Sequence, residues 1–448
     1  MDKRPRDDRD HADTRTTPTG RAFVVLPQLQ DSQGGGSRTP QARLEETVGL
    51  AEAIALEVPH AEIVRINRPD PASLFGRGTV ERLAGIVEAF DVDLVVVDHA
   101  LTPAQQRTLE RALLVKVIDR TGLILEIFGA RARTREGQLQ VELAALTYQK
   151  SRLVRSWTHL ERQRGGFGFL GGPGESQLEI DRRLIGDRIT RLNRELNDVR
   201  RTRTLHRTAR QRRATPLVAL VGYTNAGKST LFNRLARADV PAQDMMFATL
   251  DPTMRQVELP SGLGVVLSDT VGFISDLPHQ LVAAFRATLE EVQEADLILH
   301  VRDIAHPDSE AQRQDVERVL GELGIDTARD GRVIEVLNKT DRLEPTARAA
   351  LMMRLVNQRL TGGDEHAVAV SARMGLGIDA LRTLLDRRFT EARRVVEMEV
   401  DLADGRALAW LYENGEVLDR HDGDGVARLR VALATRHLTR FEAAVQAR

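Results

Sequence analysis

The sequence predicts an α/β, multi-domain protein with an N-terminal α/β domain, a long helical hairpin, a larger α/β domain and a small C-terminal α+β domain. Strand-like apolar runs alternate with helical patterns, and two stretches with helical apolar spacing enclose a glycine-rich segment. A phosphate-binding motif also stands between a strand-like run and a helix. Several domains are expected, because 448 residues exceed what one hydrophobic core usually holds.

The composition is typical of a folded, soluble protein, with 42% hydrophobic and 29% charged residues. No stretch approaches the roughly eighteen apolar residues of a membrane-spanning helix, so we expect no transmembrane segment and at most peripheral membrane association. Cysteine is absent, which excludes disulfides, cysteine zinc sites and thiol catalysis and favours a cytoplasmic location. The net charge of −1 exerts no overall attraction on nucleic acid, so such binding would need local patches.

The N-terminal part is predicted to contain a disordered tail and a parallel α/β domain. Residues 1–21 mix charged residues, threonine and proline without the apolar stretch of a signal peptide. Residues 22–137 then alternate strand and helix patterns. The strand-like runs are Ala22–Leu26, Ile63–Ile66 and Leu94–Val97, the helical patterns are Leu44–Leu56 and Val80–Phe90, and a polar, glycine-rich loop occupies Asp31–Pro40.

Residues 138–213 predict an antiparallel helical hairpin with two apolar seams. The first seam consists of Leu139, Leu143, Leu146, Leu153, Trp157 and Leu160, and the second of Leu178, Ile185, Ile189, Leu192, Leu196 and Val199. The tip between them, Arg164–Glu175, contains too much glycine and proline to be helical. The arginine-rich run Arg200–Arg213 either caps the hairpin or links it to the next domain, and a solvated helix face is its simplest interpretation.

The third domain, residues 214–392, opens with a strand-like run that leads into the motif G-x-x-x-x-G-K-S. The motif comprises Gly222, Tyr223, Thr224, Asn225, Ala226, Gly227, Lys228 and Ser229. Glycines let backbone N–H groups surround phosphates, while Lys228 would reach the β and γ oxygens and the Ser229 hydroxyl would face Mg²⁺. We therefore predict a P-loop nucleotide site with Mg²⁺ as its cofactor.

Two downstream segments indicate a switch that responds to the γ-phosphate. They are Asp269, Thr270, Val271 and Gly272, after a strand-like run, and the earlier loop of Phe247, Ala248, Thr249, Leu250 and Asp251. Asp269 is predicted to hold Mg²⁺ through water, and the Gly272 N–H to meet a γ-phosphate. Thr249 is the candidate second protein ligand to Mg²⁺, and Thr253 is its nearest competitor.

Two further segments predict that the base is guanine. They are Asn338, Lys339, Thr340 and Asp341, after a buried strand candidate, and Ser371, Ala372 and Arg373, after another. Asp341 can accept hydrogen bonds from guanine N1–H and the 2-amino group, which adenine lacks, so such a site rejects adenine. The backbone of the 371–373 loop would touch the guanine oxygen. In this order the motifs predict an enzyme that converts GTP to GDP and phosphate.

The group that activates water is not evident from the sequence. In many small GTPases a glutamine after DxxG orients the attacking water, but this position holds Phe273, which cannot hydrogen-bond to water. Turnover is therefore expected to be slow alone, with Lys228 and Thr249 as the candidates for transition-state and switch roles. Some GTPases with asparagine at the position of Asn225 bind K⁺ there, which serves as an arginine finger would; otherwise Asn225 only caps the loop.

Residues 393–448 predict a small C-terminal α+β domain. Its strand, helix and strand signals are centred on Met398–Val400, Ala407–Tyr412 and Val426–Val431. This domain carries none of the nucleotide motifs described above.

These motifs and their flanking segments resemble the HflX family of translation-associated P-loop GTPases, over nearly the whole chain beyond the tail. The segments that carry the resemblance are Ala132–Leu146, Gly172–Arg183, Gly222–Asn233, Phe247–Thr253 and Asp276–Val292, together with Phe273 after DTVG. The tip sequence RGGFGFL departs from the GGGIGTRG form of many members, so its detailed contacts need not be theirs.

The resemblance implies a protein that binds the large (50S) ribosomal subunit and, with GTP bound, helps to split or rescue stalled ribosomes. The N-terminal domain and hairpin would enter the subunit, with the tip near the peptidyl transferase centre. Arg164, Phe167 and Phe169 of the tip are candidate RNA-binding residues, because arginine binds phosphates and phenylalanine stacks on unpaired bases. From the residues alone, the alternative is a disordered hairpin turn.

Two other functions compete with a ribosome-stimulated GTPase. In a nucleotide-gated ribosome-binding switch, Phe273 would leave turnover negligible, and measuring turnover with and without large subunits separates this case. An ATP-using RNA remodeller would need a second phosphate motif, and Gly76-Arg77-Gly78 is too short to provide one. The sequence carries no signal of oligomeric state, and we expect a monomer.

Overall fold

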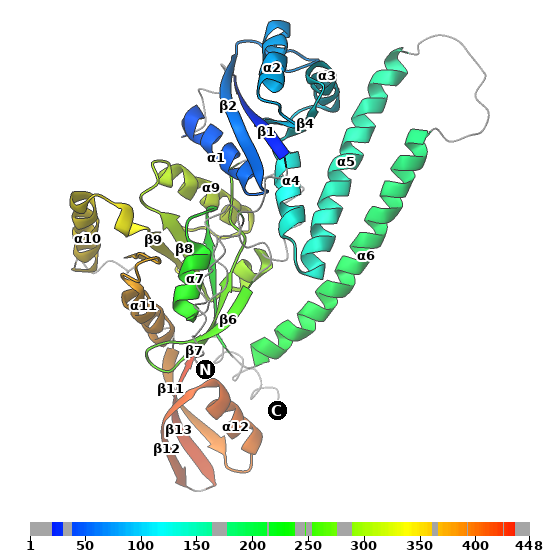
Figure 1. The fold of residues 1–448 in the computed structure, drawn as a ribbon. Coiled ribbons are helices and arrows are strands. Elements are labelled where there is room, and N and C mark those ends of the chain that lie inside the picture. Colours follow the sequence, from blue (N-terminus) through cyan, green and yellow to red (C-terminus); the bar gives the residue numbers. More distant parts are fainter. Residues whose placement is uncertain are drawn as a thin grey trace, which may run out of the picture. The chain divides into compact units, whose positions relative to one another are not determined.

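The computed structural model describes residues 20–29, 38–163, 177–212, 215–237, 247, 253–275, 289–360, 366–391, 393–423 and 425–434 (Figure 1). The chain divides into two compact units, residues 1–130 with 149–174, and residues 131–148 with 175–448. The predicted fold class is confirmed, with separate α/β, helical and α+β parts. None of the described helices is long and apolar enough to cross a membrane.

A four-stranded parallel sheet in the order β2-β1-β3-β4 forms the centre of the N-terminal unit. Its strands are β1 (Gly20–Leu29), β2 (Leu56–Ile66), β3 (Leu94–Val97) and β4 (Lys116–Asp119), and its helices are α1 (Pro40–Glu52), α2 (Arg77–Ala89), α3 (Pro103–Leu113) and α4 (Arg120–Arg131). Apolar strand residues such as Phe23, Val95 and Val117 pack on Leu83 and Leu109 of the helices. This packing explains the alternating pattern of the sequence.

Three predicted boundaries in this unit were wrong, by two residues at the start of β1 and by more at the starts of α1 and β2. Strand β1 begins at Gly20, inside the predicted tail, where the Asp93 carboxylate accepts a hydrogen bond from the Arg21 N–H. Helix α1 begins at Pro40, inside the predicted loop, because Thr39 caps its N-terminus and proline suits the first turn. Strand β2 starts at Leu56, where the sequence predicted a helix, and its partly exposed polar residues concealed an edge strand.

The predicted helical hairpin consists of α5 (Arg135–Gln163) and α6 (Gln177–Arg212). Two ion pairs, Arg135 with Glu195 at 2.6 Å and Arg188 with Glu142 at 2.7 Å, connect the helices in antiparallel order. The seam between them contains Leu139, Leu143, Leu146, Leu192, Leu196 and Val199. The predicted seams thus hold together the beginning of α5 and the middle of α6.

The second half of α5 belongs to the N-terminal unit. There the Arg152 guanidinium binds the Asp119 carboxylate at 2.5 Å, hydrogen-bonds to the Leu101 carbonyl oxygen at 3.3 Å and contacts the Gln106 amide. At the other end of the hairpin, α6 continues through the arginine-rich run to Arg212. Only four residues then separate it from the next strand, so the run links the hairpin to the third domain.

A six-stranded sheet in the order β10-β9-β8-β5-β7-β6 forms the third domain, with only β6 antiparallel. Its strands are β5 (Leu217–Gly222), β6 (Thr253–Glu258), β7 (Gly264–Asp269), β8 (Leu297–Asp303), β9 (Val333–Asn338) and β10 (Ala367–Ala369). The helices are α7 (Lys228–Ala236), α9 (Ser309–Glu322), η2 (Thr340–Arg342), α10 (Pro345–Leu360) and α11 (Ile378–Glu391).

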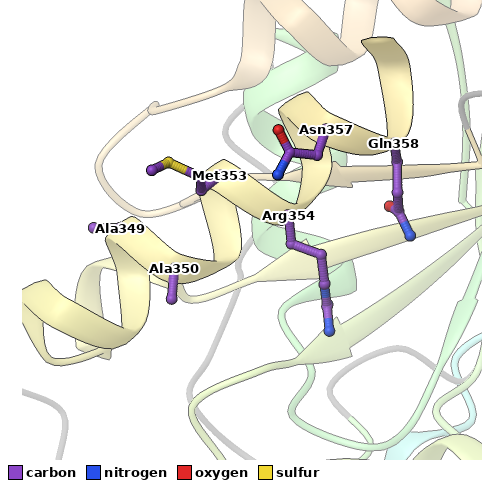
Figure 2. A pocket seen from close by; sticks show the side chains of 6 residues that line it. All are labelled: Ala349, Ala350, Met353, Arg354, Asn357 and Gln358. Carbon is purple, nitrogen blue, oxygen red and sulfur yellow. The ribbon is translucent and has the colours of Figure 1, made fainter. Parts of the chain in front are cut away.

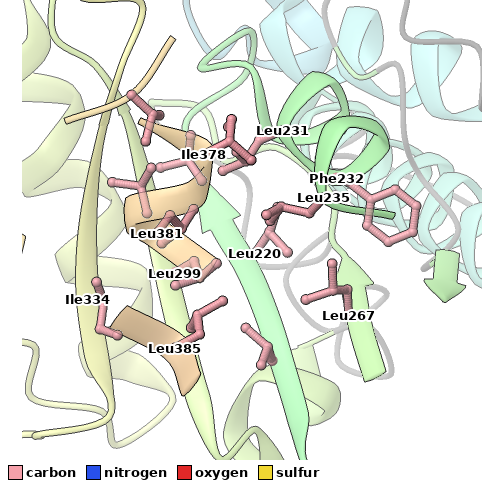
Figure 3. Packing of buried hydrophobic residues seen from close by; sticks show 14 of the residues in the cluster. Leu220, Leu231, Phe232, Leu235, Leu267, Leu299, Ile334, Ile378, Leu381 and Leu385 are labelled. Carbon is pink, nitrogen blue, oxygen red and sulfur yellow. The ribbon is translucent and has the colours of Figure 1, made fainter. Parts of the chain in front are cut away.

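One apolar cluster fills the space between this sheet and helices α7 and α11 (Figure 3). Leu220 and Leu299 of the central strands pack with Leu231 and Phe232 of α7 and with Leu381 of α11. All the predicted nucleotide motifs except the 247–251 loop follow the carboxyl ends of β5, β7, β9 and β10. Parallel strands bring these ends to one edge of the sheet, where ligands of such folds bind.

The C-terminal part is an antiparallel sheet in the order β11-β13-β12 with one helix. Its elements are β11 (Arg393–Asp401), α12 (Gly405–Asn414), β12 (Glu416–Gly423) and β13 (Val426–Ala434). Leu411, Leu429 and Leu433 are in its core. The sequence did not predict β12, because this edge strand is rich in aspartate, histidine and other polar residues and pairs only with β13.

Candidate guanine-nucleotide site

The phosphate-binding loop leaves β5 at Gly222 and enters α7 at Lys228. A Cβ atom on Gly222 would lie 2.2 Å from the carbonyl oxygen of Val301 in β8, and one on Gly227 would lie 2.3 Å from the Asn338 amide nitrogen. Gly227 also has a φ of 92°, where a side chain is strained. Both glycines are therefore required by close approach, and they place the loop before the N-terminus of a helix, where anions bind.

The Lys228 ammonium is buried beneath this loop. It donates hydrogen bonds to the carbonyl oxygens of Gly222 at 3.1 Å and Tyr223 at 2.9 Å. Burial lowers the pKa of Lys228 to about 8, although the Asp269 carboxylate acts in the opposite direction. An anion placed beside this ammonium would stabilise its charged form, which is the role expected for a P-loop lysine.

Ser229 and Asp269 supply two oxygen atoms at the start of α7 and the end of β7. The Ser229 hydroxyl donates a hydrogen bond to the Asp269 carboxylate at 2.7 Å, and Asp269 is buried. Among the described residues, no group of three or more His, Cys, Asp or Glu side chains could hold a metal alone. A hydroxyl and a carboxylate fit Mg²⁺, which takes few protein ligands and completes its shell with phosphate oxygens and water.

The DTVG segment is tied to the phosphate-binding loop through the residues that follow it. The Phe273 N–H donates to the Gly222 carbonyl oxygen at 3.1 Å, and the Thr224 N–H donates to the Phe273 carbonyl oxygen at 2.7 Å. The Tyr223 hydroxyl accepts a further hydrogen bond from the Ser275 N–H at 2.9 Å. The ring of Phe273 is buried, so this residue holds the segment in place and offers no group to water.

Asn338 connects the two halves of the site. Its side-chain amide nitrogen donates to the Ala226 carbonyl oxygen of the phosphate-binding loop at 2.9 Å, and its amide oxygen accepts from the Ala372 N–H at 3.0 Å. Asn338 is buried, so neither hydrogen bond competes freely with water. One side chain thereby joins loops that are far apart in the sequence.

The side chain of Asp341 is held in place by the neighbouring loop. The Ser371 hydroxyl donates to the Asp341 carboxylate at 2.5 Å, while the Thr340 hydroxyl donates to the Val370 carbonyl oxygen at 2.9 Å. These bonds occupy one carboxylate oxygen and connect the two predicted base-binding segments. The arrangement is compatible with the carboxylate pairing with a guanine edge.

Two residues at this edge were missed by the sequence reasoning. Arg234 of α7 donates to the carbonyl oxygens of Ala372 at 3.1 Å and Arg373 at 2.6 Å. Asp303, the last residue of β8, forms an ion pair with Lys339 at 2.8 Å. Asp303 had a usable signal, since it ends a strand at the same sheet edge as the motifs, but Arg234 had none.

Four family models match consecutive parts of the chain. They are described as GTP-binding GTPase N-terminal (residues 41–129), GTP-binding GTPase Middle Region (131–210), 50S ribosome-binding GTPase (217–339) and HflX C-terminal domain (355–445). A protein named GTPase HflX from Magnetococcus marinus is 51% identical over 406 residues, which cover 91% of each chain. The chain belongs to the HflX family of GTPases.

A second relative of the same name agrees with this membership. The GTPase HflX of Escherichia coli K12 is 43% identical over 373 residues, which cover 83% of this chain and 84% of that protein. A solved GTP-binding protein from Sulfolobus solfataricus in complex with GDP is 21% identical and covers 83% of this chain and 99% of that chain, with a TM-score of 0.43. Membership of the HflX family confirms the predictions of the family and of a GTPase.

Some predicted site residues of this HflX-family chain lie outside the described residues. They are Ala248, Thr249, Leu250 and Asp251 of the switch loop and Arg164, Phe167 and Phe169 of the hairpin tip. Phe247 is described and buried, with a φ of 54°. The assignments of Mg²⁺ to Thr249 and of RNA to the tip therefore remain predictions.

An open hollow of about 660 Å³ lies along α10, and none of its lining residues belongs to a nucleotide motif (Figure 2). It is lined by Ala349, Ala350, Met353, Arg354, Asn357 and Gln358. These residues include no acid, histidine or hydroxyl group, so this face has no general base or nucleophile. The nucleotide chemistry is expected at the sheet edge.

Proposed function

We propose that this chain binds the large ribosomal subunit and, with GTP bound, splits or rescues stalled ribosomes, GTP hydrolysis then permitting its release. The observation that carries the proposal is the pair of long helices α5 and α6, the second of which leads directly into the nucleotide domain. Helices of 29 and 36 residues are roughly 43 and 54 Å long, and four residues join the second to the GTPase domain. The family model over residues 217–339, described as a 50S ribosome-binding GTPase, supports the partner.

At the nucleotide, each motif would bind a different part of GTP. The P-loop N–H groups and Lys228 would bind the phosphates, and Asp341 with the 371–373 loop would bind guanine. Ser229, Asp269 through water, and Thr249 would hold Mg²⁺, which neutralises the charge of the β- and γ-phosphates. The Gly272 N–H would meet the γ-phosphate, so loss of that phosphate would remove one contact of the DTVG segment.

The hairpin tip would supply the RNA contacts. Arg164 would pair with phosphate, and Phe167 and Phe169 would stack on unpaired bases of ribosomal RNA. Because the RNA contacts lie in the tip and the nucleotide contacts lie in the GTPase domain, variants of the tip should impair ribosome binding and leave nucleotide binding unaffected.

Sedimentation with purified large subunits tests the proposal. The chain should travel with subunits when bound to a non-hydrolysable GTP analogue and not when bound to GDP, and should separate intact ribosomes in a light-scattering assay. Replacing Phe167 and Phe169 with alanine should weaken subunit binding about tenfold or more, with unchanged GTP affinity in solution. Leu170→Ala in the same tip is the matched control, because it removes apolar surface but no aromatic ring.

Three outcomes would reject parts of this proposal. If the chain binds large subunits equally well with GDP and with the GTP analogue, binding is not controlled by the nucleotide. If intact ribosomes do not separate, the chain does not split them. Unchanged subunit binding after loss of both phenylalanines would remove the assigned role of the tip.

Asn225 is the candidate K⁺ ligand in the same site. Its side chain is exposed, its φ is 57°, and it makes no hydrogen bond to any residue that the structure describes. This leaves its amide oxygen accessible to a cation beside the phosphates and does not support a loop-capping role. GTP turnover should be higher in KCl than in NaCl, and Asn225→Ala should remove the difference; equal rates in the two salts would exclude the K⁺ role.

A further inference from the structure

Thr224 carries a buried hydroxyl that the functions described above do not use. The residue is only 5% exposed, and its Oγ1 has no hydrogen-bond partner among the described residues. Buried hydroxyls in native proteins are nearly always hydrogen-bonded, because water's hydrogen bonds are lost on burial. An exception inside a ligand site suggests that the ligand provides the missing partner.

The position of Thr224 identifies which part of the ligand that would be. A Cβ atom on Gly272 would lie 2.9 Å from both the Cα and the Cγ2 of Thr224, and 3.2 Å from the Lys228 ammonium. Thr224 and the Lys228 ammonium therefore both pack directly against Gly272. In P-loop GTPases the glycine of DxxG and the P-loop lysine meet at the γ-phosphate.

Two of the neighbouring side chains, Phe273 and Lys228, cannot orient an attacking water. Phe273 is buried and has no polar side-chain atom, and the Lys228 ammonium has donors but no acceptor. A threonine hydroxyl has one donor and two acceptor lone pairs, so it can accept a hydrogen bond from water while donating one to phosphate.

We propose that Thr224 is a catalytic residue in GTP hydrolysis and performs the water-orienting role that glutamine has in other GTPases. Its Oγ1 accepts a hydrogen bond from the attacking water and donates one to a γ-phosphate oxygen. The water oxygen forms a bond to the γ-phosphorus, and the bond from that phosphorus to the bridging oxygen breaks, with the electron pair leaving on GDP. The water proton passes to phosphate, and Thr224 neither gains nor loses a proton.

This inference rests on the proposed nucleotide assignment but not on the ribosomal role. It also predicts an unusual combination of effects. A valine at position 224 keeps the shape of threonine and removes the unsatisfied hydroxyl, so the nucleotide-free protein should become no less stable. A structural hydroxyl would have the opposite effect.

The experiment compares Thr224→Val and Thr224→Ser with the control Thr383→Val. The Thr383 hydroxyl donates to the Asp379 carbonyl oxygen on the exposed face of α11. Turnover is measured with the full chain and saturating GTP, without ribosomes, together with GDP affinity and the melting temperature without nucleotide. Thr224→Val should lower kcat by about ten- to a hundredfold, with GDP affinity within about twofold of wild type and no fall in melting temperature. Thr224→Ser should recover most of the activity.

Every other result overturns the proposal. Unchanged kcat in Thr224→Val would show that the hydroxyl takes no part in hydrolysis. A fall in kcat accompanied by equal losses of GDP affinity and melting temperature would show a structural role. Failure of Thr224→Ser to recover activity would show that the hydroxyl is not the group that matters. A negative result in the ribosome experiments would not affect these three measurements, because they are made without ribosomes.

Discussion

Asn338→Ala would remove both hydrogen bonds that connect the phosphate-binding loop to the base-binding loops. The Ala226 carbonyl oxygen and the Ala372 N–H, now 2.9 and 3.0 Å from the Asn338 amide, would lose their partners inside a buried region. Each hydrogen bond contributes about 0.5–1.5 kcal/mol, and unpaired buried groups raise the cost, so the total is about 2–3 kcal/mol. For a domain of this size, that lowers the melting temperature by about 4–12 °C.

Thermal unfolding of the nucleotide-free protein measures this effect, and the GTPase-domain transition is the one that moves when GDP is added. GDP affinity should also fall at least about tenfold, because the two loops would have to be ordered by the nucleotide alone. Asn357→Ala, on the exposed face of α10, is the control and should change neither quantity. A melting temperature within about 1 °C of wild type would refute the energetic argument, and a lower melting temperature with unchanged GDP affinity would refute the coupling between the loops.

Two further predictions concern Tyr223 and His300. Tyr223→Phe removes the acceptor for the Ser275 N–H and should weaken binding of a non-hydrolysable GTP analogue about three- to tenfold. The Tyr223→Phe variant should keep its GDP affinity, and the control Tyr412→Phe should keep its affinity for both GDP and the GTP analogue. An equal loss of GDP affinity in Tyr223→Phe would contradict the prediction. Burial lowers the pKa of His300 to about 3 from 6.5, so its contribution to stability is complete above about pH 6.5 and declines as the pH falls towards 3. Denaturant titrations measure the free energy of unfolding at each pH. Between about pH 7 and pH 5, this free energy should fall by about 2 kcal/mol more in wild type and in the exposed-site control His306→Asn than in His300→Asn. Equal falls in all three proteins would refute the assignment.

The nucleotide motifs could be predicted from sequence because each needs particular residue types at short, constant spacing. Gly222 and Gly227 admit no Cβ atom, and Lys228 must follow at the start of a helix. The strand-like runs before the motifs then placed them at one sheet edge, since parallel strands share the direction of their carboxyl ends. The hairpin was predictable for a similar reason, because its apolar residues repeat at helical spacing.

Contacts between distant residues could not be predicted in this way. Arg234 binds the carbonyl oxygen of Ala372, 138 residues away, and only the packing of α7 beside the end of β10 brings them together. The Tyr223–Ser275 hydrogen bond likewise depends on the segment after β7 lying against the P-loop. Strand β12 has no pattern of its own and exists because β13 offers an edge.

By itself, the sequence determined the family, the GTPase chemistry and the order of the domains, because these depend on local residue types and on periodic apolar spacing. Only the tertiary structure decided how the site's parts are joined: Asn338 between two loops, Phe273 turned into the core, and Thr224 left with a buried, unpaired hydroxyl among the described residues. Burial and hydrogen-bond partners are properties of the packed chain, since they depend on which distant segments surround each side chain.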